Sequence, residues 1–112
     1  MLNFLVVLFM FMQGSHLSCD DFYQKELDPL HIEGDVIKKE IGEQFYEIEV
    51  SDKKKGKLKF HLLKNMAGFE VYNFLLPGSH VFKKEGHRDI HVLTENKLDG
   101  SIKGKIFDNL CR

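Results

Sequence analysis

The 112-residue sequence has little net charge, only two cysteines and only one long apolar run. Its formal charge of −1 at pH 7 argues against broad, non-specific binding to nucleic acid, because such binding needs a basic surface. The lysine-rich residues 53–59 are a local exception, and a run of this kind is usually a solvated loop. No second apolar run, internal repeat or low-complexity linker follows, so the sequence predicts one small domain and no membrane protein.

The single apolar run covers residues 2–12 and is followed by small and polar residues up to Ser18. It is too short to span a bilayer, and an apolar stretch followed by small residues is typical of a secretory signal peptide. The run lacks the usual preceding Lys or Arg, and cleavage could follow Ser15 or Ser18. A buried N-terminal helix is the alternative. The prediction is a signal peptide over residues 1–18, a mature domain over residues 19–112, and secretion.

The two cysteines, Cys19 and Cys111, stand at the two ends of the predicted mature chain. In an oxidising compartment two cysteines allow one bridge. Closing a loop of about 90 residues would contribute on the order of 4–5 kcal/mol to stability. Two free thiols are the alternative.

The N-terminal half of the mature chain predicts an arm followed by one helix. Residues 19–33 read as a short β-hairpin or an irregular arm with a turn at Asp28-Pro29. Residues 35–47 carry apolar side chains at three- and four-residue steps, which predicts a helix with its N-terminal cap at Gly34-Asp35. Residues 47–50 alternate and could instead be strand.

The remaining chain predicts short strands. Residues 68–78 are apolar on both faces and end at a Pro-Gly turn, which predicts a central strand with Asn73 in its middle. Residues 57–64 alternate, with His61, Lys57 and Lys59 on the polar face. Further strands are expected over 79–84 and 88–94, and a last strand pair over 98–107 is expected to be broken at Asp99-Gly100 and at Gly104. The predicted class is α+β, with one helix packed on a small twisted antiparallel sheet whose other face is partly exposed and carries His61.

Several segments then follow one another in a known order. Residues 59–61 are similar to a Tyr-Pro-His strand, residues 64–69 to an Asn-rich segment ending in Glu-Gly-Phe, and residues 72–76 to a Tyr-Glu-aromatic-Pro-Ile-Leu strand. Val81-Phe82 is similar to Val-Tyr, and residues 88–102 to an Asp-Arg-Val stretch followed by Leu-x-Gly-Val-Ile. With cysteines at both ends, this order resembles the fungal guanyl-specific ribonuclease fold and, more closely, the RNase-like secreted effectors of powdery mildew fungi.

The resemblance implies a ribonuclease-like fold but departs from it at the catalytic positions. His61 falls at the supporting histidine and Arg88 at the arginine, whereas Asn73 stands at the glutamate base and no histidine stands near Lys103-Gly104, the acid position. The Tyr-x-Cys signature of many such effectors is replaced by residues 17–19, Leu-Ser-Cys. An amide cannot accept a proton as a general base, so a pseudo-ribonuclease is predicted rather than an enzyme.

The leading functional hypothesis is therefore a non-catalytic secreted virulence effector of a fungal pathogen that binds host RNA, host protein or both. A monomer without cofactor or membrane contact is expected, and the resemblance implies delivery into host cells. The candidate binding residues are His61, Arg88, Asn73, Lys57 and Lys59.

Two other functions stay open. One is an unrelated small secreted β-rich module such as an inhibitor. The other is an active ribonuclease with a site rebuilt on His61, Arg88 and either His87 or His91. No metal site is predicted, since the histidines at 80, 87 and 91 fall in a turn and strands where their spacing does not bring them to one ion.

Overall fold

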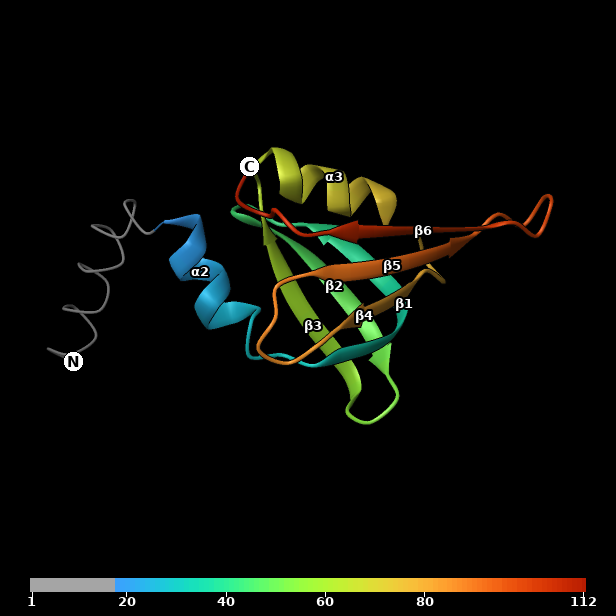
Figure 1. Cartoon of the computed structure of the whole chain (residues 1–112), viewed down its shortest axis with the longest axis horizontal. Coiled ribbons are helices and arrows are strands. Elements are labelled where there is room, and N and C mark those ends of the chain that lie inside the picture. The colour runs from blue at the N-terminus through green and yellow to red at the C-terminus, as the bar shows by residue number, and fades with distance from the viewer. Residues whose placement is uncertain (1–17) are drawn as a thin grey trace, which may run out of the picture.

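The computed structural model describes residues 18–112, which form two helices and one six-stranded antiparallel sheet (Figure 1). The strands stand in the order β3-β2-β1-β4-β5-β6, so β1 and β4 meet at the centre while β3 and β6 are the edges. In chain order the elements are α2 (Cys19–Glu26), β1 (Ile32–Ile41), β2 (Phe45–Asp52), β3 (Gly56–Leu63), α3 (Met66–Phe74), β4 (His80–Lys83), β5 (Ile90–Glu95) and β6 (Ile102–Phe107).

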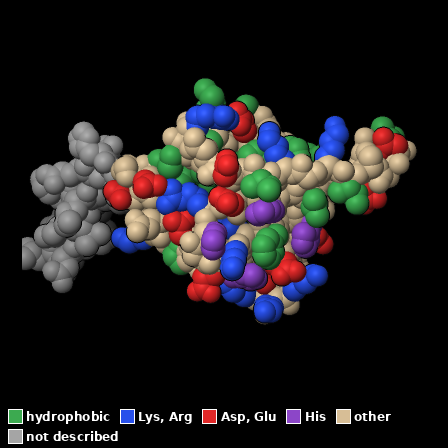
Figure 2. All heavy atoms as spheres, viewed as in Figure 1, with side chains coloured by type: hydrophobic (Ala, Val, Ile, Leu, Met, Phe, Trp, Pro, Cys, Tyr) green, Lys and Arg blue, Asp and Glu red, His purple; other side chains and the backbone are tan. Residues whose placement is uncertain are grey.

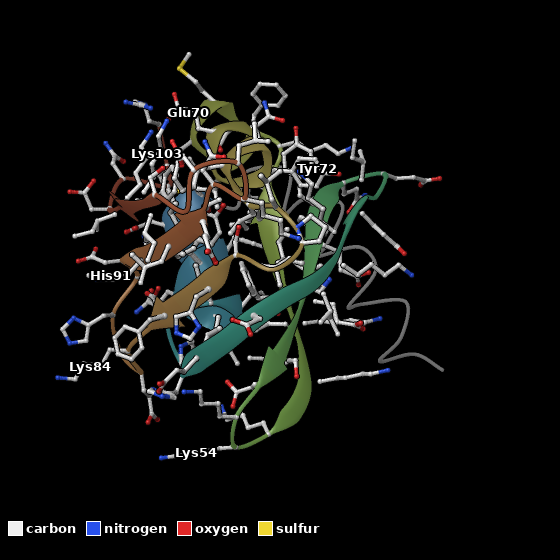
Figure 3. All side chains as sticks on the ribbon, turned by 90° about the vertical axis from the view of Figure 1, so that its right-hand side faces the viewer. Lys54, Glu70, Tyr72, Lys84, His91 and Lys103 are labelled. Carbon is white, nitrogen blue, oxygen red and sulfur yellow. A yellow bond between two sulfur atoms is a disulfide. The ribbon has the colours of Figure 1, made fainter. Side chains whose placement is uncertain are left out.

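The helices and the inner face of the sheet enclose one hydrophobic core. Figure 3 shows the sheet curled, with α3 on its open side. Tyr72 of α3 stacks on Tyr46 of β2 with ring centroids 4.6 Å apart, and Phe74 packs edge-on against Phe107 of β6 at 5.6 Å. Helix α3 therefore spans the gap between the two halves of the sheet. The fully buried side chains include Tyr23, Leu27, Ile32, Ile48, Phe60, Leu62, Val71, Leu75, Val81, Ile90 and Leu110.

The predicted α+β class and the disulfide are confirmed. Cys19 and Cys111 are bonded across a separation of 92 residues, and Figure 1 shows the C-terminus beside the start of α3. The sheet is antiparallel throughout, and no helix of residues 18–112 covers its outer face, which is partly exposed and carries His61 as expected. Residues 18–112 contain two helices rather than the one predicted for the mature chain. The predicted signal peptide lies outside the described residues except for Ser18.

The helix predicted over residues 35–47 is wrong, because this segment forms β1, a turn and the start of β2. The reason is a β-bulge between Val36 and Lys38. Positions on the inner face run Ile32, Gly34, Val36 and then, one residue late, Lys39, which pairs with the buried Ile48. A bulge inserts one extra residue and turns a step of two into a step of three, which imitates helical spacing.

The central strand predicted over residues 68–78 is also wrong, because residues 66–74 form α3. Asn65 caps this helix, its side-chain oxygen accepting a hydrogen bond from the Gly68 N–H at 2.7 Å. The buried residues Ala67, Val71 and Leu75 recur every four positions. The segment therefore presents one helical stripe to the core.

The arm predicted over residues 19–33 contains helix α2 instead of a hairpin. The Ser18 hydroxyl accepts a hydrogen bond from the Asp21 N–H at 3.1 Å, and Asp20 and Asp21 occupy the first turn while Lys25 occupies the last. Capping and this charge order favour a helix over an irregular arm. The strands predicted over 57–64, 79–84 and 88–94 are confirmed. The strand pair predicted over 98–107 is a single strand, Ile102–Phe107, because Gly104 pairs with Leu93 within the ladder and does not break it.

The buried carboxylate of Asp52 gives the fold a predictable acid sensitivity. Burial alone would raise its pKa, but backbone N–H groups of Glu33, Lys54 and Lys55 donate to it at 2.9–3.1 Å and hold the pKa below its usual value. The carboxylate therefore stabilises the fold above pH of about 4, its unfolded pKa, and this contribution is lost as pH falls through the lower folded pKa.

We expect Asp52→Asn to lower the free energy of unfolding by about 1–2 kcal/mol at pH 7, because an amide accepts these donors less well than a carboxylate. The difference from the unmodified protein should shrink as pH falls below about 4. Urea unfolding at a series of pH values measures both quantities. A difference that stays constant down to strongly acidic pH would contradict the role given to Asp52.

Candidate functional site

Three of the predicted RNA-binding residues lie together on the outer face of β3, but two of them stand beside acidic residues of β2. His61 is paired with Glu47 across the strands, its Nε2 lying 3.3 Å from the carboxylate. The Lys59 Nζ lies 3.9 Å from the same Glu47 and opposite Glu49, and Lys57 stands opposite Ser51. This side of the sheet is therefore a mixed-charge surface rather than a basic groove.

Arg88 lies elsewhere and is held in ion pairs. Its guanidinium donates to both carboxylate oxygens of Asp28, at 2.9 and 2.8 Å, and also pairs with Asp20 of α2. It lies 5.7 Å from the centre of the Tyr23 ring. Hydrogen bonding to Asp28 and Asp20 raises the pKa of Arg88. These contacts tie the segment before β5 to α2.

Asn73 is exposed on α3, so the structure does not bring it together with His61 or Arg88. A small hollow lies near His61, on the outer face of β1, β2 and β3. It measures about 50 Å³ and is lined by Lys38, Glu40, Glu47, Glu49 and Lys59. Sites for small molecules are larger and mostly apolar, so this hollow offers a poor fit for a substrate.

A different group of side chains gathers on the other half of the outer face, over β4 and β5. Phe82 is 36% exposed and meets two imidazole rings edge-on, His31 at 5.8 Å and His91 at 6.0 Å between ring centroids. His80 and Leu93 stand opposite each other on the same face. We call these five side chains the histidine–phenylalanine patch. Figure 2 shows histidines gathered around hydrophobic side chains on this face.

The strand register extends this patch into two rows across four strands. One row runs from Glu33 through Phe82 and His91 to Ile106. The other runs from Asp35 through His80 and Leu93 to Gly104. Each row is thus acidic at β1 and has an imidazole beside a large apolar side chain in the middle, Phe82 in one row and Leu93 in the other. At β6 the rows end at Ile106 and Gly104. Figure 3 shows His91 pointing away from the body of the protein.

The acidic ends of the rows hold the patch in place. The His80 Nδ1 lies 3.1 Å from the Asp35 carboxylate, and the His31 Nε2 lies 3.9 Å from Glu33. Beyond β4 the β5–β6 hairpin projects from the body, as Figure 1 shows. It carries further exposed apolar residues, with Leu93 50%, Ile106 56% and Ile102 67% exposed.

The candidate site predicted from the sequence did not include this patch, although the alternation of buried and exposed residues along β4 and β5 indicates part of it. Along the strand expected over 88–94, the exposed His91 alternates with the buried Ile90 and Val92. Phe82 alternates with the buried Val81 and Lys83 in the same way. The sequence does not give the pairing of Phe82 with His91 or the approach of His31, because both depend on strand register.

Other kinds of site have little support in residues 18–112. No group of three or more His, Cys, Asp or Glu side chains there could hold a metal ion. Within the same residues, no helix is long and apolar enough to cross a membrane. Comparison of the chain with protein-family models, with curated proteins and with solved structures finds no match.

Proposed function

We propose that the protein is a secreted, non-catalytic binding module that holds a protein partner on its histidine–phenylalanine patch. The observation that carries this proposal is the exposed Phe82 flanked edge-on by His31 and His91 on an uncovered sheet face. An aromatic centre surrounded by polar and ionisable groups is the usual anatomy of a protein–protein interface. The terminal disulfide is consistent with secretion, since such bonds persist in oxidising compartments.

A protein partner fits this surface better than RNA does. Phosphate binding depends on cations that are free to replace counterions. The guanidinium of Arg88 is already paired with Asp28 and Asp20, and Lys59 and His61 stand beside Glu47. The middle of the patch could stack bases, but its β1 end carries Glu33 and Asp35, which repel phosphate.

The proposal does not depend on the resemblance to ribonucleases. The segment compared with their glutamate-bearing strand is the end of helix α3 rather than a strand next to His61, and Asn73 is exposed there. His61 and Glu47 could exchange a proton, but the hollow beside them has no apolar wall to hold a substrate. A binding role needs none of these groups to be reactive.

The test places a photoreactive phenylalanine analogue at position 82 and, as a matched control, at position 69. Phe69 is 52% exposed but lies on α3, away from the patch. Both proteins are irradiated with extracellular and cellular protein fractions of the source organism and of its host. We expect a partner that crosslinks from position 82 and not from position 69.

The identified partner is then purified and titrated with the unmodified protein, with Phe82→Ala and with Phe69→Ala. We expect Phe82→Ala to weaken binding roughly tenfold or more, as truncation of a central aromatic anchor does, and Phe69→Ala to have little effect. Equal effects of the two substitutions would contradict the proposal. A parallel titration with single-stranded RNA should give neither binding nor cleavage; salt-sensitive binding would favour the RNA function, and cleavage would make the protein an enzyme.

A further inference from the structure

Strand β6 is an edge strand whose backbone is open to a partner. Its residues from Ile102 to Ile106 are all exposed. Within residues 18–112 the hydrogen bonds of its backbone run only to β5. The opposite edge is partly covered, since the N–H of Leu63 in β3 donates to the hydroxyl of Tyr23 in α2 at 2.9 Å. Only the β6 edge is thus free along its length in the described chain.

The two faces of β6 differ in chemistry. Ile102 and Ile106 lie on the outer face, in line with Glu95 and His91 of β5. Lys103 and Lys105 lie on the other face, and neither makes a salt bridge within residues 18–112. Figure 3 shows Lys103 on the β6 side of the molecule. A strand lying against this edge would meet isoleucines on one face and ammonium groups on the other.

A second copy of the chain is a poor occupant of this edge. A two-fold antiparallel pairing of β6 with itself has two registers that each match five residues. The one centred on Gly104 places Lys103 of each copy opposite Lys105 of the other, and the one centred on Lys105 places the two Lys105 side chains opposite each other. Like charges directly opposite each other destabilise a strand pair. Edge lysines are a common protection against self-association. The same lysines favour a strand that carries carboxylates at those positions.

We propose that β6 takes up an extended segment of a partner protein, in which apolar and acidic residues alternate, as an added antiparallel strand. The backbone ladder supplies affinity, and the alternating side chains supply specificity. The acidic residues lie beside Lys103 and Lys105, and the apolar residues beside Ile102 and Ile106. This inference rests on the proposed binding function and adds the kind of segment bound, since both rows of the outer face end at β6.

Lys105 is already positioned to meet an acidic residue of an added strand. Its Nζ lies 4.9 Å from the centre of the Phe107 ring and 5.8 Å from that of Phe74. These rings support the side chain along the inner side of the edge. A carboxylate of an added strand would find this ammonium without first breaking an ion pair.

The test uses the purified protein with its disulfide intact and three short peptides, which alternate valine with glutamate, with serine or with lysine. We expect the glutamate peptide to bind most tightly and to shift the backbone amide resonances of β6 in NMR spectra. The same peptide, N-methylated at alternate positions so that it cannot form the ladder, should lose binding. In Lys103→Glu/Lys105→Glu the preference should reverse, with the lysine peptide gaining about tenfold and the glutamate peptide losing as much.

Several outcomes would overturn the inference. It fails if the peptides do not bind, or if the N-methylated peptide binds as well as the unmodified one. It also fails if binding shifts amide resonances outside β6, or if sedimentation shows that the protein self-associates through β6. The partner found from position 82 separates the two proposals. If it binds Lys103→Glu/Lys105→Glu normally, the patch function stands and strand addition fails. If the peptides bind β6 but nothing crosslinks from Phe82, strand addition stands and the patch function fails.

Discussion

Replacing both cysteines by serine is expected to lower the free energy of unfolding by about 4–5 kcal/mol. The bond between Cys19 and Cys111 closes a loop with a sequence separation of 92 residues, so it restricts almost the whole unfolded chain. The entropy removed from the unfolded state grows with the length of the closed loop. For a small domain this loss is a large fraction of total stability.

The disulfide also holds together the start of α2, the start of α3 and the C-terminal residues. The Asn65 side chain donates to the Leu110 carbonyl at 2.9 Å, and the Ala67 N–H donates to the Arg112 carbonyl at 3.3 Å. In Cys19→Ser/Cys111→Ser we expect these two hydrogen bonds to break first while the sheet stays folded. Denaturant unfolding, with hydrogen exchange of the β1 and β5 amides, measures both effects. Unchanged stability in the double variant and in the reduced protein would contradict this account.

The sequence allowed the class of the fold to be predicted, but not the identity of two central elements. Around β1 the misleading feature was the bulge at Val36–Lys38, which only tertiary pairing with β2 creates. Around α3 most residues are apolar, so the same sequence is compatible both with a strand that is apolar on both faces and with a helix. The four-residue recurrence of Ala67, Val71 and Leu75 and the cap at Asn65 were the available signals for the helix.

Helix α2 was missed for a different reason. Its cap is Ser18, a residue assigned to the signal peptide, so the helical start signal was divided between two predicted segments. The ion pairs of Arg88 could not be predicted from the sequence, because its partners Asp28 and Asp20 lie 60 and 68 residues away. Side chains that meet through tertiary contacts of this kind leave no local pattern. Alternation along single strands was reliable, as at His61 and His91.

Gly68→Ala is expected to destabilise the protein by about 2–3 kcal/mol, although alanine is the better helix former. In an exposed helix this change would gain about 1 kcal/mol. Here a Cβ at position 68 would overlap the carbonyl oxygen of Leu63 at the end of β3. That atom belongs to the backbone and cannot swing aside, so α3 or β3 must shift, and forced overpacking of this kind costs about 1–3 kcal/mol or more.

A matched control lies in the same helix. Asn73 is exposed near the end of α3, and Asn73→Ala should leave stability unchanged or raise it by a few tenths of a kcal/mol. Urea unfolding of the two variants separates helix propensity from the contact with β3. If Gly68→Ala were as stable as Asn73→Ala, α3 would not approach β3 as closely as its glycine allows. The close approach matters for function because α3 closes the inner side of the sheet and leaves the outer face as the open surface.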